Sequence, residues 1–287
     1  MTGTYKKILT VTLLAARLAV ADEASPVPRV PPDTKAIVPV LGTRSGKPTK
    51  GHIRFCEQAK AGGFDVLFLG DSITANWGGP GKEVWDRVIA PFTAVNFGFP
   101  GNKTEDVLWG LDNGLMEAAL DPKVIVLMLG VNNTRARSDP PEAIAAGVGA
   151  IVDRLYKRFP KAHILLFGIF PCGATPDDPV RKIDAAANAL MARFEGYHNV
   201  HYLDIGAKLL EKDGTLSKEI VPDLLHPGPK GYEIWGAVLE GELKALLGKQ
   251  QGEVNPRTRS GYEDNDDGFV DGVGDILDLR HGRGRHR

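Results

Sequence analysis

Three side chains that together could cleave an ester stand far apart in the sequence: Ser72, Asp223 and His226. A serine hydroxyl can act as a nucleophile, a histidine can take its proton, and an aspartate can orient the imidazole ring. One serine is weak evidence, because serine is also common in turns and at helix starts. The three residue types in this chain order nevertheless predict nucleophilic attack on a carbonyl carbon.

The residues before Ser72 indicate how it is positioned. The run 66–69 is apolar throughout, which is typical of a strand buried on both faces of a parallel sheet. Gly70 and Asp71 follow, so Ser72 lies at the carboxyl end of that strand, where open α/β folds bind their ligands. The Gly-x-Ser-x-Gly elbow of α/β-hydrolases does not fit, because Thr74 occupies the second glycine position.

Two later blocks could donate hydrogen bonds to an oxyanion. Gly101 follows a second candidate strand, and a glycine there lets its backbone N–H approach a ligand closely. Asn132 follows a third, and its side-chain amide could donate to developing negative charge. Both residues are also routine in turns, so only the combination with Ser72 is informative.

Together these blocks resemble the SGNH (GDSL) hydrolase superfamily, and most of all its branch of platelet-activating-factor acetylhydrolase catalytic subunits and related bacterial esterases. The resemblance extends over about residues 65–247. The matching segments are 70–72, 96–98 with Gly101, 107–109, 122–126, 130–133 and 223–226. Four ordered blocks at these spacings make a specific signal, whereas any one of them would be weak.

The resemblance implies a role for each site residue. Ser72 would be the nucleophile, His226 the base and Asp223 its orienting acid. The backbone N–H groups of Ser72 and Gly101 and the side chain of Asn132 would form the oxyanion hole. The reaction would pass through an acyl-enzyme without a metal ion or other cofactor.

This sequence departs from the commonest superfamily pattern at two positions. Asn133 stands where an aspartate is more usual, a variation that also occurs in the acetylhydrolase-like branch. Pro100 precedes Gly101 and restricts Phe99 to an extended backbone, which would change the rim of the site.

Residues next to the catalytic ones indicate the size of the acyl group. In acetylhydrolase-like relatives, the positions of Ile73, Val131 and Leu225 bound the acyl pocket. Branched side chains there predict acetyl rather than long-chain esters. The export predicted below, and not these residues, favours an acetylated carbohydrate as the substrate. The alternatives are a phospholipid, lysophospholipid or thioester hydrolase with the same triad, and a carbohydrate-binding protein without catalysis.

The elements that would position this site alternate along the chain. Candidate strands are 66–69, 94–97, 124–129, 163–167 and 200–203, and candidate helices are 104–120, 141–159, 179–196 and 229–247. Strands separated by helices pair in parallel through right-handed crossovers. We therefore expect an α/β fold: a three-layer αβα sandwich around a parallel five-stranded, flavodoxin-like sheet.

The composition and charge give no support for a nucleic-acid partner. The chain of 287 residues is 43% hydrophobic and 25% charged, with a formal net charge of −1. This charge gives no reason to expect nucleic acid as a partner. Lys6 and Lys7 precede an apolar run over 8–21 that ends in Ala-Val-Ala, which predicts a signal peptide and a secreted or periplasmic protein. The alternative is an amphipathic N-terminal helix or a poorly ordered leader. No other window approaches a membrane span.

The predicted organisation is a signal peptide at 1–21, an extended proline-rich arm at 22–50, a hydrolase domain at 51–249 and a tail at 250–287. The tail has a weak calcium-loop pattern with Asn265, Asp267 and Asp271, against a default of an acidic disordered segment. The two cysteines, Cys56 and Cys172, could be bridged or separate. Relatives often dimerise, so a homodimer is possible.

Several other side chains could contact a substrate. We expect Trp77, Trp85 and Trp109 to pack in the core or at its rim, with sugar binding as the alternative. Arg135 and Arg137 follow Asn132 closely; a solvated loop is the expectation, and contact with a polar substrate the alternative.

Overall fold

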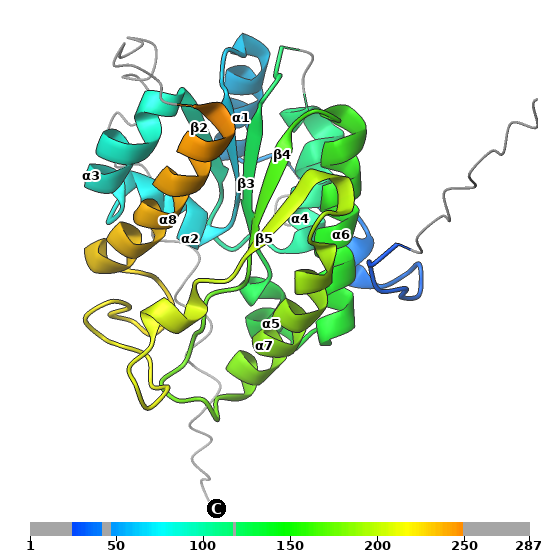
Figure 1. Cartoon of the computed structure of the whole chain (residues 1–287). Coiled ribbons are helices and arrows are strands. Elements are labelled where there is room, and N and C mark those ends of the chain that lie inside the picture. Colours follow the sequence, from blue (N-terminus) through cyan, green and yellow to red (C-terminus); the bar gives the residue numbers. More distant parts are fainter. Residues whose placement is uncertain (1–24, 42–46, 117–118, 249–287) are drawn as a thin grey trace, which may run out of the picture.

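A computed structural model describes residues 25–41, 47–116 and 119–248 and shows one parallel sheet between two layers of helices (Figure 1). Its five strands lie in the order β2-β1-β3-β4-β5. The strands are β1 (Val66–Gly70), β2 (Ala94–Gly98), β3 (Val124–Met128), β4 (His163–Phe167) and β5 (Val200–Leu203). The expected parallel αβα sandwich is confirmed, and each predicted strand is present to within one residue at either end.

The helices form around this sheet as the alternating pattern predicts. They are α1 (Lys50–Ala61), α2 (Ser72–Ala75), α3 (Lys82–Val84), α4 (Thr104–Gly110), α5 (Val131–Arg137), α6 (Pro141–Arg158), α7 (Pro179–Met191) and α8 (Pro229–Leu247). In Figure 1, α3 and α8 cover one face of the sheet, and α4, α6 and α7 cover the other. Helices on both faces explain why the central strands β1 and β3 carry no polar side chain.

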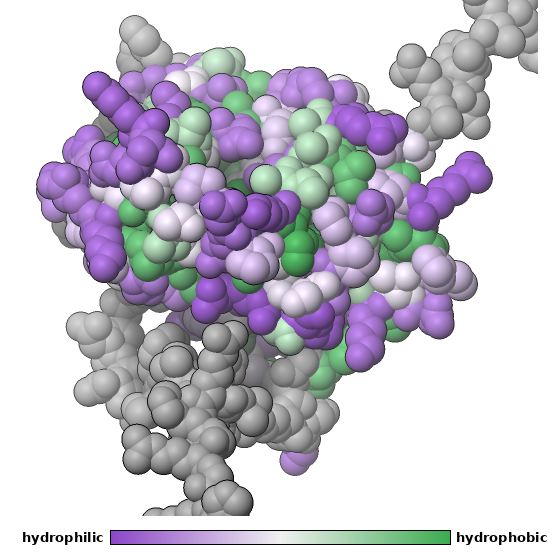
Figure 2. Space-filling view, turned by 90° about the horizontal axis from the view of Figure 1, so that it is seen from below, coloured by the Kyte–Doolittle hydropathy of each residue, from purple (hydrophilic) through white to green (hydrophobic). Residues whose placement is uncertain are grey.

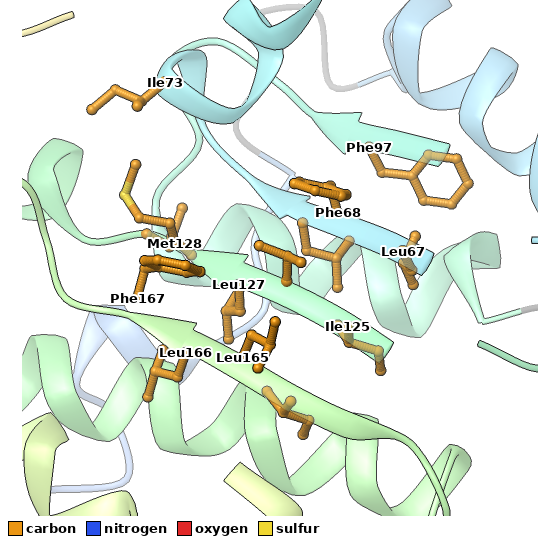
Figure 3. Close-up of a cluster of buried hydrophobic side chains, with 14 of the residues drawn as sticks. Leu67, Phe68, Ile73, Phe97, Ile125, Leu127, Met128, Leu165, Leu166 and Phe167 are labelled. Carbon is orange, nitrogen blue, oxygen red and sulfur yellow. The ribbon is translucent and has the colours of Figure 1, made fainter. Parts of the chain in front are cut away.

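The core lies on both sides of the central strands (Figure 3). Every residue of β1, β2 and β3 is buried. Phe68 contacts Trp77 and Trp85 edge to face, while the ring of Phe97 stacks on Phe55 of α1, 5.0 Å away. Trp77 is fully buried, so the expectation of core packing holds for it.

Three features of the fold differ from the expectation. Helices α1 and α5 and the short helical segments over 82–92 have no counterpart among the predicted helices. Helix α4 ends ten residues earlier than predicted, because a wide helical turn follows in which Gly114 has a φ of 109°. A positive φ of this size breaks an α-helix and suits glycine.

The proline-rich segment packs onto the domain instead of standing clear of it. The carbonyl of Ala36 accepts a hydrogen bond from the Thr104 hydroxyl at 2.8 Å, and the Val40 amide donates to the Glu105 carbonyl. Ala36 is 1% exposed. Residues 25–41 therefore pack as part of the same domain as the sheet. Helix α1, which follows them, begins at Lys50.

Candidate active site

The strand order reverses next to β1, and this reversal defines the site. β1 pairs with β2 on one side and with β3 on the other. The connection from β1 to β2 runs toward one edge of the sheet, and the connection from β2 to β3 crosses back past β1 toward the other edge. A crevice forms at such a switch point, outside the carboxyl ends of the strands. Ser72 follows β1, Gly101 follows β2 and Asn132 follows β3, so all three lie along this edge.

Ser72 is the first residue of α2, and the local sequence fixes it there. The side chain of Asp71 accepts a hydrogen bond from the Ile73 amide at 2.9 Å and caps the helix. The start of α2 lies so close to β1 and β3 that a Cβ at Gly70 would be 2.1 Å from the Thr74 hydroxyl and 2.5 Å from the Met128 carbonyl. Glycine before Asp71 is therefore required by packing.

The structure brings the three distant side chains together. The hydroxyl oxygen of Ser72 is 2.9 Å from Nε2 of His226, and Nδ1 of His226 is 2.7 Å from Oδ2 of Asp223. An ionised carboxylate only accepts, so the Nδ1 proton donates to Asp223 and Nε2 remains an acceptor for the serine hydroxyl.

Backbone contacts hold the loop that carries His226. Oδ1 of Asp223 accepts from the amides of Leu225 at 3.0 Å and His226 at 2.6 Å. Leu224 has a φ of 63°, an uncommon conformation for a leucine. The amide of Gly173, in the loop after β4, donates to the Leu224 carbonyl at 2.9 Å and stabilises that conformation.

The electrostatics keep Asp223 charged. Partial burial works to raise its pKa, but the hydrogen bonds from the His226 ring and from the His226 and Leu225 amides lower the pKa below the ordinary carboxyl value overall. The carboxylate is therefore available at neutral pH to support an imidazolium.

The two other predicted oxyanion donors lie beside each other. Nδ2 of Asn132 donates to the Asn102 carbonyl at 3.0 Å, one residue beyond Gly101, and approaches Oδ2 of Asp71 at 3.4 Å. Gly101 has a φ of 80° and would have no atom within 4 Å of an added Cβ, so its backbone is open to a ligand. The role of both residues in an oxyanion hole stays a prediction.

Sequence reasoning assigned no role to Asp71 or Asp184, two buried carboxylic acids near this edge. Burial raises the pKa of each to about 7, partly offset by hydrogen bonds from the Ile73 amide and the Thr134 hydroxyl respectively. Thr134 contacts Oδ1 of Asp184 at 2.5 Å. Apolar surroundings in the folded chain set both values, so the sequence carries no local signal for them.

The residues predicted to bound the acyl pocket differ in how far they are exposed. Ile73 and Val131 are each 1% exposed, and Leu225 is half-buried. Figure 3 shows Ile73 on α2, beyond the carboxyl end of β1.

A separate hollow of about 110 Å³ adjoins the 99–102 loop between α1 and α4, and Trp109 and His52 line it. Trp109 therefore lies at a rim, as expected for one of the tryptophans.

Arg137 does not lie in a solvated loop. Its guanidinium donates to Oε1 of Glu105 and to both carboxylate oxygens of Asp139, while Arg135 is exposed. The expectation was wrong for Arg137, because its partner Glu105 lies 32 residues away in the sequence. Neither Cys56 nor Cys172 is in a disulfide bond.

Other expectations concern binding of ions or membranes. Within residues 25–41, 47–116 and 119–248, no three His, Cys, Asp or Glu side chains are grouped to hold a metal ion. Among the same residues, no helix combines the length and apolar character needed to span a bilayer. The predicted signal peptide and the calcium candidates Asn265, Asp267 and Asp271 lie outside the described residues.

Comparison with known proteins places this geometry in a family. The model of the GDSL-like lipase/acylhydrolase family matches residues 68–234, which include Ser72, Asp223 and His226. The chain belongs to this family. It is a carboxylic ester hydrolase, as the family and its esterase members indicate.

Curated relatives match most of the catalytic domain. The rat platelet-activating factor acetylhydrolase IB subunit alpha1 is 34% identical over 206 residues, or 71% of this chain and 86% of the relative. The rat subunit alpha2 is 37% identical over 182 residues, or 63% of this chain and 76% of the relative.

Solved structures share the fold. A structure from Streptococcus pneumonia, described as a platelet activating factor, is 25% identical, with a TM-score of 0.57 over 68% of this chain and 91% of the other. A mutant of an acetyl-xylooligosaccharide esterase from Geobacillus stearmophilus has a TM-score of 0.51 over 68% and 98%, at 17% identity. At 17% identity, the likeness to this esterase structure shows a shared fold alone.

Proposed function

We propose that this hydrolase is a serine esterase that removes short acyl groups, with acetyl preferred, through a Ser72–His226–Asp223 triad. The observation that supports it most directly is the 2.9 Å contact between the Ser72 hydroxyl and Nε2 of His226, with Asp223 on the opposite ring nitrogen. This is the arrangement in which a base can remove the hydroxyl proton as the oxygen attacks.

In the first half of the reaction, the Ser72 oxygen attacks the ester carbonyl while His226 takes its proton. The tetrahedral oxyanion accepts hydrogen bonds from the Ser72 and Gly101 amides and from Asn132. Loss of one such donor typically costs about 3–4 kcal/mol, or about 10²–10³ in rate. The alcohol then leaves with the proton held by His226.

In the second half, water attacks the acyl-serine and His226 acts again as base. Asp223 remains ionised through both halves, because its pKa is lowered by the groups that donate to it. Its contact with Nδ1 keeps Nε2 directed at the serine and stabilises the imidazolium. No step transfers a proton to Asp223.

The acyl preference rests on the three neighbours of the catalytic residues. Ile73 and Val131 are buried, so bulk beyond an acetyl methyl would have to displace packed side chains or extend past Leu225. The names of the curated relatives, which are acetylhydrolases, agree with this preference.

For the alcohol half, we propose an acetylated carbohydrate and an enzyme exported from the cytoplasm. Figure 2 looks onto the carboxyl-end edge of the sheet, and the visible described surface there interleaves hydrophilic and hydrophobic side chains without a broad apolar area. Such a surface suits a polar polymer better than a lipid bilayer. A platelet-activating-factor-like phospholipid is the alternative that the names of the relatives favour.

The test compares the purified chain with Ser72→Ala on p-nitrophenyl esters of increasing acyl length, on acetylated xylan and on an acetyl phospholipid. We expect acetate to be the best acyl group and Ser72→Ala to lose about 10³-fold or more in kcat. Unchanged activity in Ser72→Ala would exclude the proposed triad. Equal rates on acetyl and long-chain esters would exclude the acyl preference, and faster release from the phospholipid would exclude the carbohydrate substrate.

A further inference from the structure

A buried polar cluster joins the two segments that carry the predicted oxyanion donors: the first turn of α5, with Asn132, and the segment from Gly101 to the start of α4. The cluster consists of Asn133, Thr104, Glu105, Arg137 and Asp139. Asn133 immediately follows Asn132, and Thr104 lies three residues after Gly101. Asn133 and Thr104 are fully buried and Glu105 is 4% exposed. The cluster therefore connects α5 to the start of α4.

Asn133 makes the direct connection between the starts of α5 and α4. Its side-chain oxygen accepts from the Thr104 amide at 3.0 Å, while its side-chain nitrogen lies 3.1 Å from the Thr104 hydroxyl. The same nitrogen faces Glu105 at 3.2 Å and Asp139 at 3.1 Å. One side chain thus fixes the first turn of α4 against the backbone that carries Asn132.

Asn132 cannot provide this connection during turnover. Its amide nitrogen has two N–H groups, and these face the Asn102 carbonyl and Asp71. Donating to an oxyanion requires Asn132 to give up or share one of those contacts. The contact between Asn133 and Thr104 is fully buried, so it can persist throughout the reaction.

The charges around position 133 explain why it is asparagine. Glu105 and Asp139 both accept from the single guanidinium of Arg137. Burial works against ionisation of Asp139, but hydrogen bonds from Arg137 and Asn133 lower its pKa overall. An aspartate at position 133 would add a third carboxylate and would place one of its oxygens where the Asn133 nitrogen now donates. Like charges at this range in a buried setting are strongly unfavourable.

From these contacts we infer that Asn133 is a positioning residue, which sets the separation between the Gly101 amide and the Asn132 side chain by clamping Thr104. The inference rests on the proposed function, because it concerns the oxyanion donors of that mechanism. Asn133 itself touches no reacting atom. Its effect appears in the transition state, where both donors must reach the same oxygen.

The test is Asn133→Asp in the full chain, assayed on p-nitrophenyl acetate. We expect kcat to fall by about 10²-fold, the scale of a misplacement of about 1 Å, with KM changed by no more than about threefold. Asn133→Asp combined with Glu105→Gln restores the number of carboxylates around Arg137. We expect this double variant to recover most of the lost kcat.

The matched control is Asn188→Asp. Asn188 also bridges a backbone amide and a carbonyl, those of Ile169 at 2.8 and 2.9 Å, and these hydrogen bonds involve neither α5 nor the start of α4. We expect a lower melting temperature for this control with kcat within about twofold of the parent. This separates positioning from general loss of stability.

Three results would overturn the inference: a folded Asn133→Asp protein with unchanged kcat, an equal loss of kcat in the control, or no recovery in the double variant. If Asn133→Asp does not fold, the kcat of the double variant is compared with that of Glu105→Gln alone. A kcat about tenfold lower in the double variant would then overturn the inference. Unchanged activity in Ser72→Ala would instead reject the proposed function.

Discussion

At the scale of single residues, buried acids set how stability depends on pH. Burial raises the pKa of Asp184 from 3.8 to about 7, so the folded chain holds that proton more tightly than the unfolded chain does. The stabilisation from this acid is therefore complete below about pH 4 and is lost as pH rises through 7. Asp71 acts in the same direction.

Asp184→Asn removes this dependence at one of the two sites. We expect the free energy of unfolding of the parent to fall relative to the variant between pH 4 and 7, by at most about 4 kcal/mol. Urea unfolding at pH 5 and at pH 8 measures the difference. Asp177→Asn is the control, because that side chain is 93% exposed. A parent and variant with parallel pH curves would contradict the prediction.

At the scale of elements, the closeness of α2 to the sheet is what presents Ser72. A Cβ at Gly98 would lie 2.5 Å from the amide nitrogen of Ala75 and 2.7 Å from the carbonyl carbon of Thr74. Both are backbone atoms of the α2 segment, so they cannot move unless α2 moves. Gly98→Ala should therefore destabilise the fold by about 1–3 kcal/mol and lower esterase activity.

Gly241→Ala provides the matched control for this prediction. Gly241 is inside α8, and an added Cβ there would meet no atom within 4 Å. Alanine is the better helix former, so this variant should gain about 0.5–1 kcal/mol with its activity unchanged. Melting temperatures and rates on p-nitrophenyl acetate measure both variants. A Gly98→Ala protein with the parent's melting temperature and activity would refute the packing argument.

At the scale of the molecule, the segment that carries Ser72 and the helix that follows His226 pack on one core. The hydroxyl of Tyr232 in α8 donates to the Ile73 carbonyl in α2 at 2.6 Å. The ring of Trp77 packs against Tyr232 at 4.7 Å and against Trp235 at 5.0 Å between ring centres. Tryptophan fluorescence therefore reports the core that supports both Ser72 and the His226 loop.

We expect loss of activity and the change in fluorescence to share one urea midpoint, as in a two-state transition. Incubating the protein in graded urea and reading both signals from the same samples tests this. Activity lost at clearly lower urea than the fluorescence change would show that the His226 loop opens before the core unfolds.

The sequence contained enough information for the strands and for the last helix. Apolar runs bounded by turn residues located β1 to β5, and Pro229 marked the start of α8. The end of α4 and the unpredicted helices α1 and α5 depended on tertiary packing that periodicity does not encode. For the site, the motif positions led to Ser72, Asp223 and His226, which the fold brings together. The raised pKa of Asp184 and the partners of Arg137 needed contacts between distant segments.

All five strands run in one direction, so the amino ends of the strands lie on the side of the molecule opposite Ser72 (Figure 1). His163 and His201 meet there, 2.9 Å apart, and the exposed Lys161 lies just before β4. Immobilising the protein on a resin through that lysine would leave Ser72 on the side facing away from the resin. An insoluble, branched polymer could then reach it as freely as a small aryl acetate.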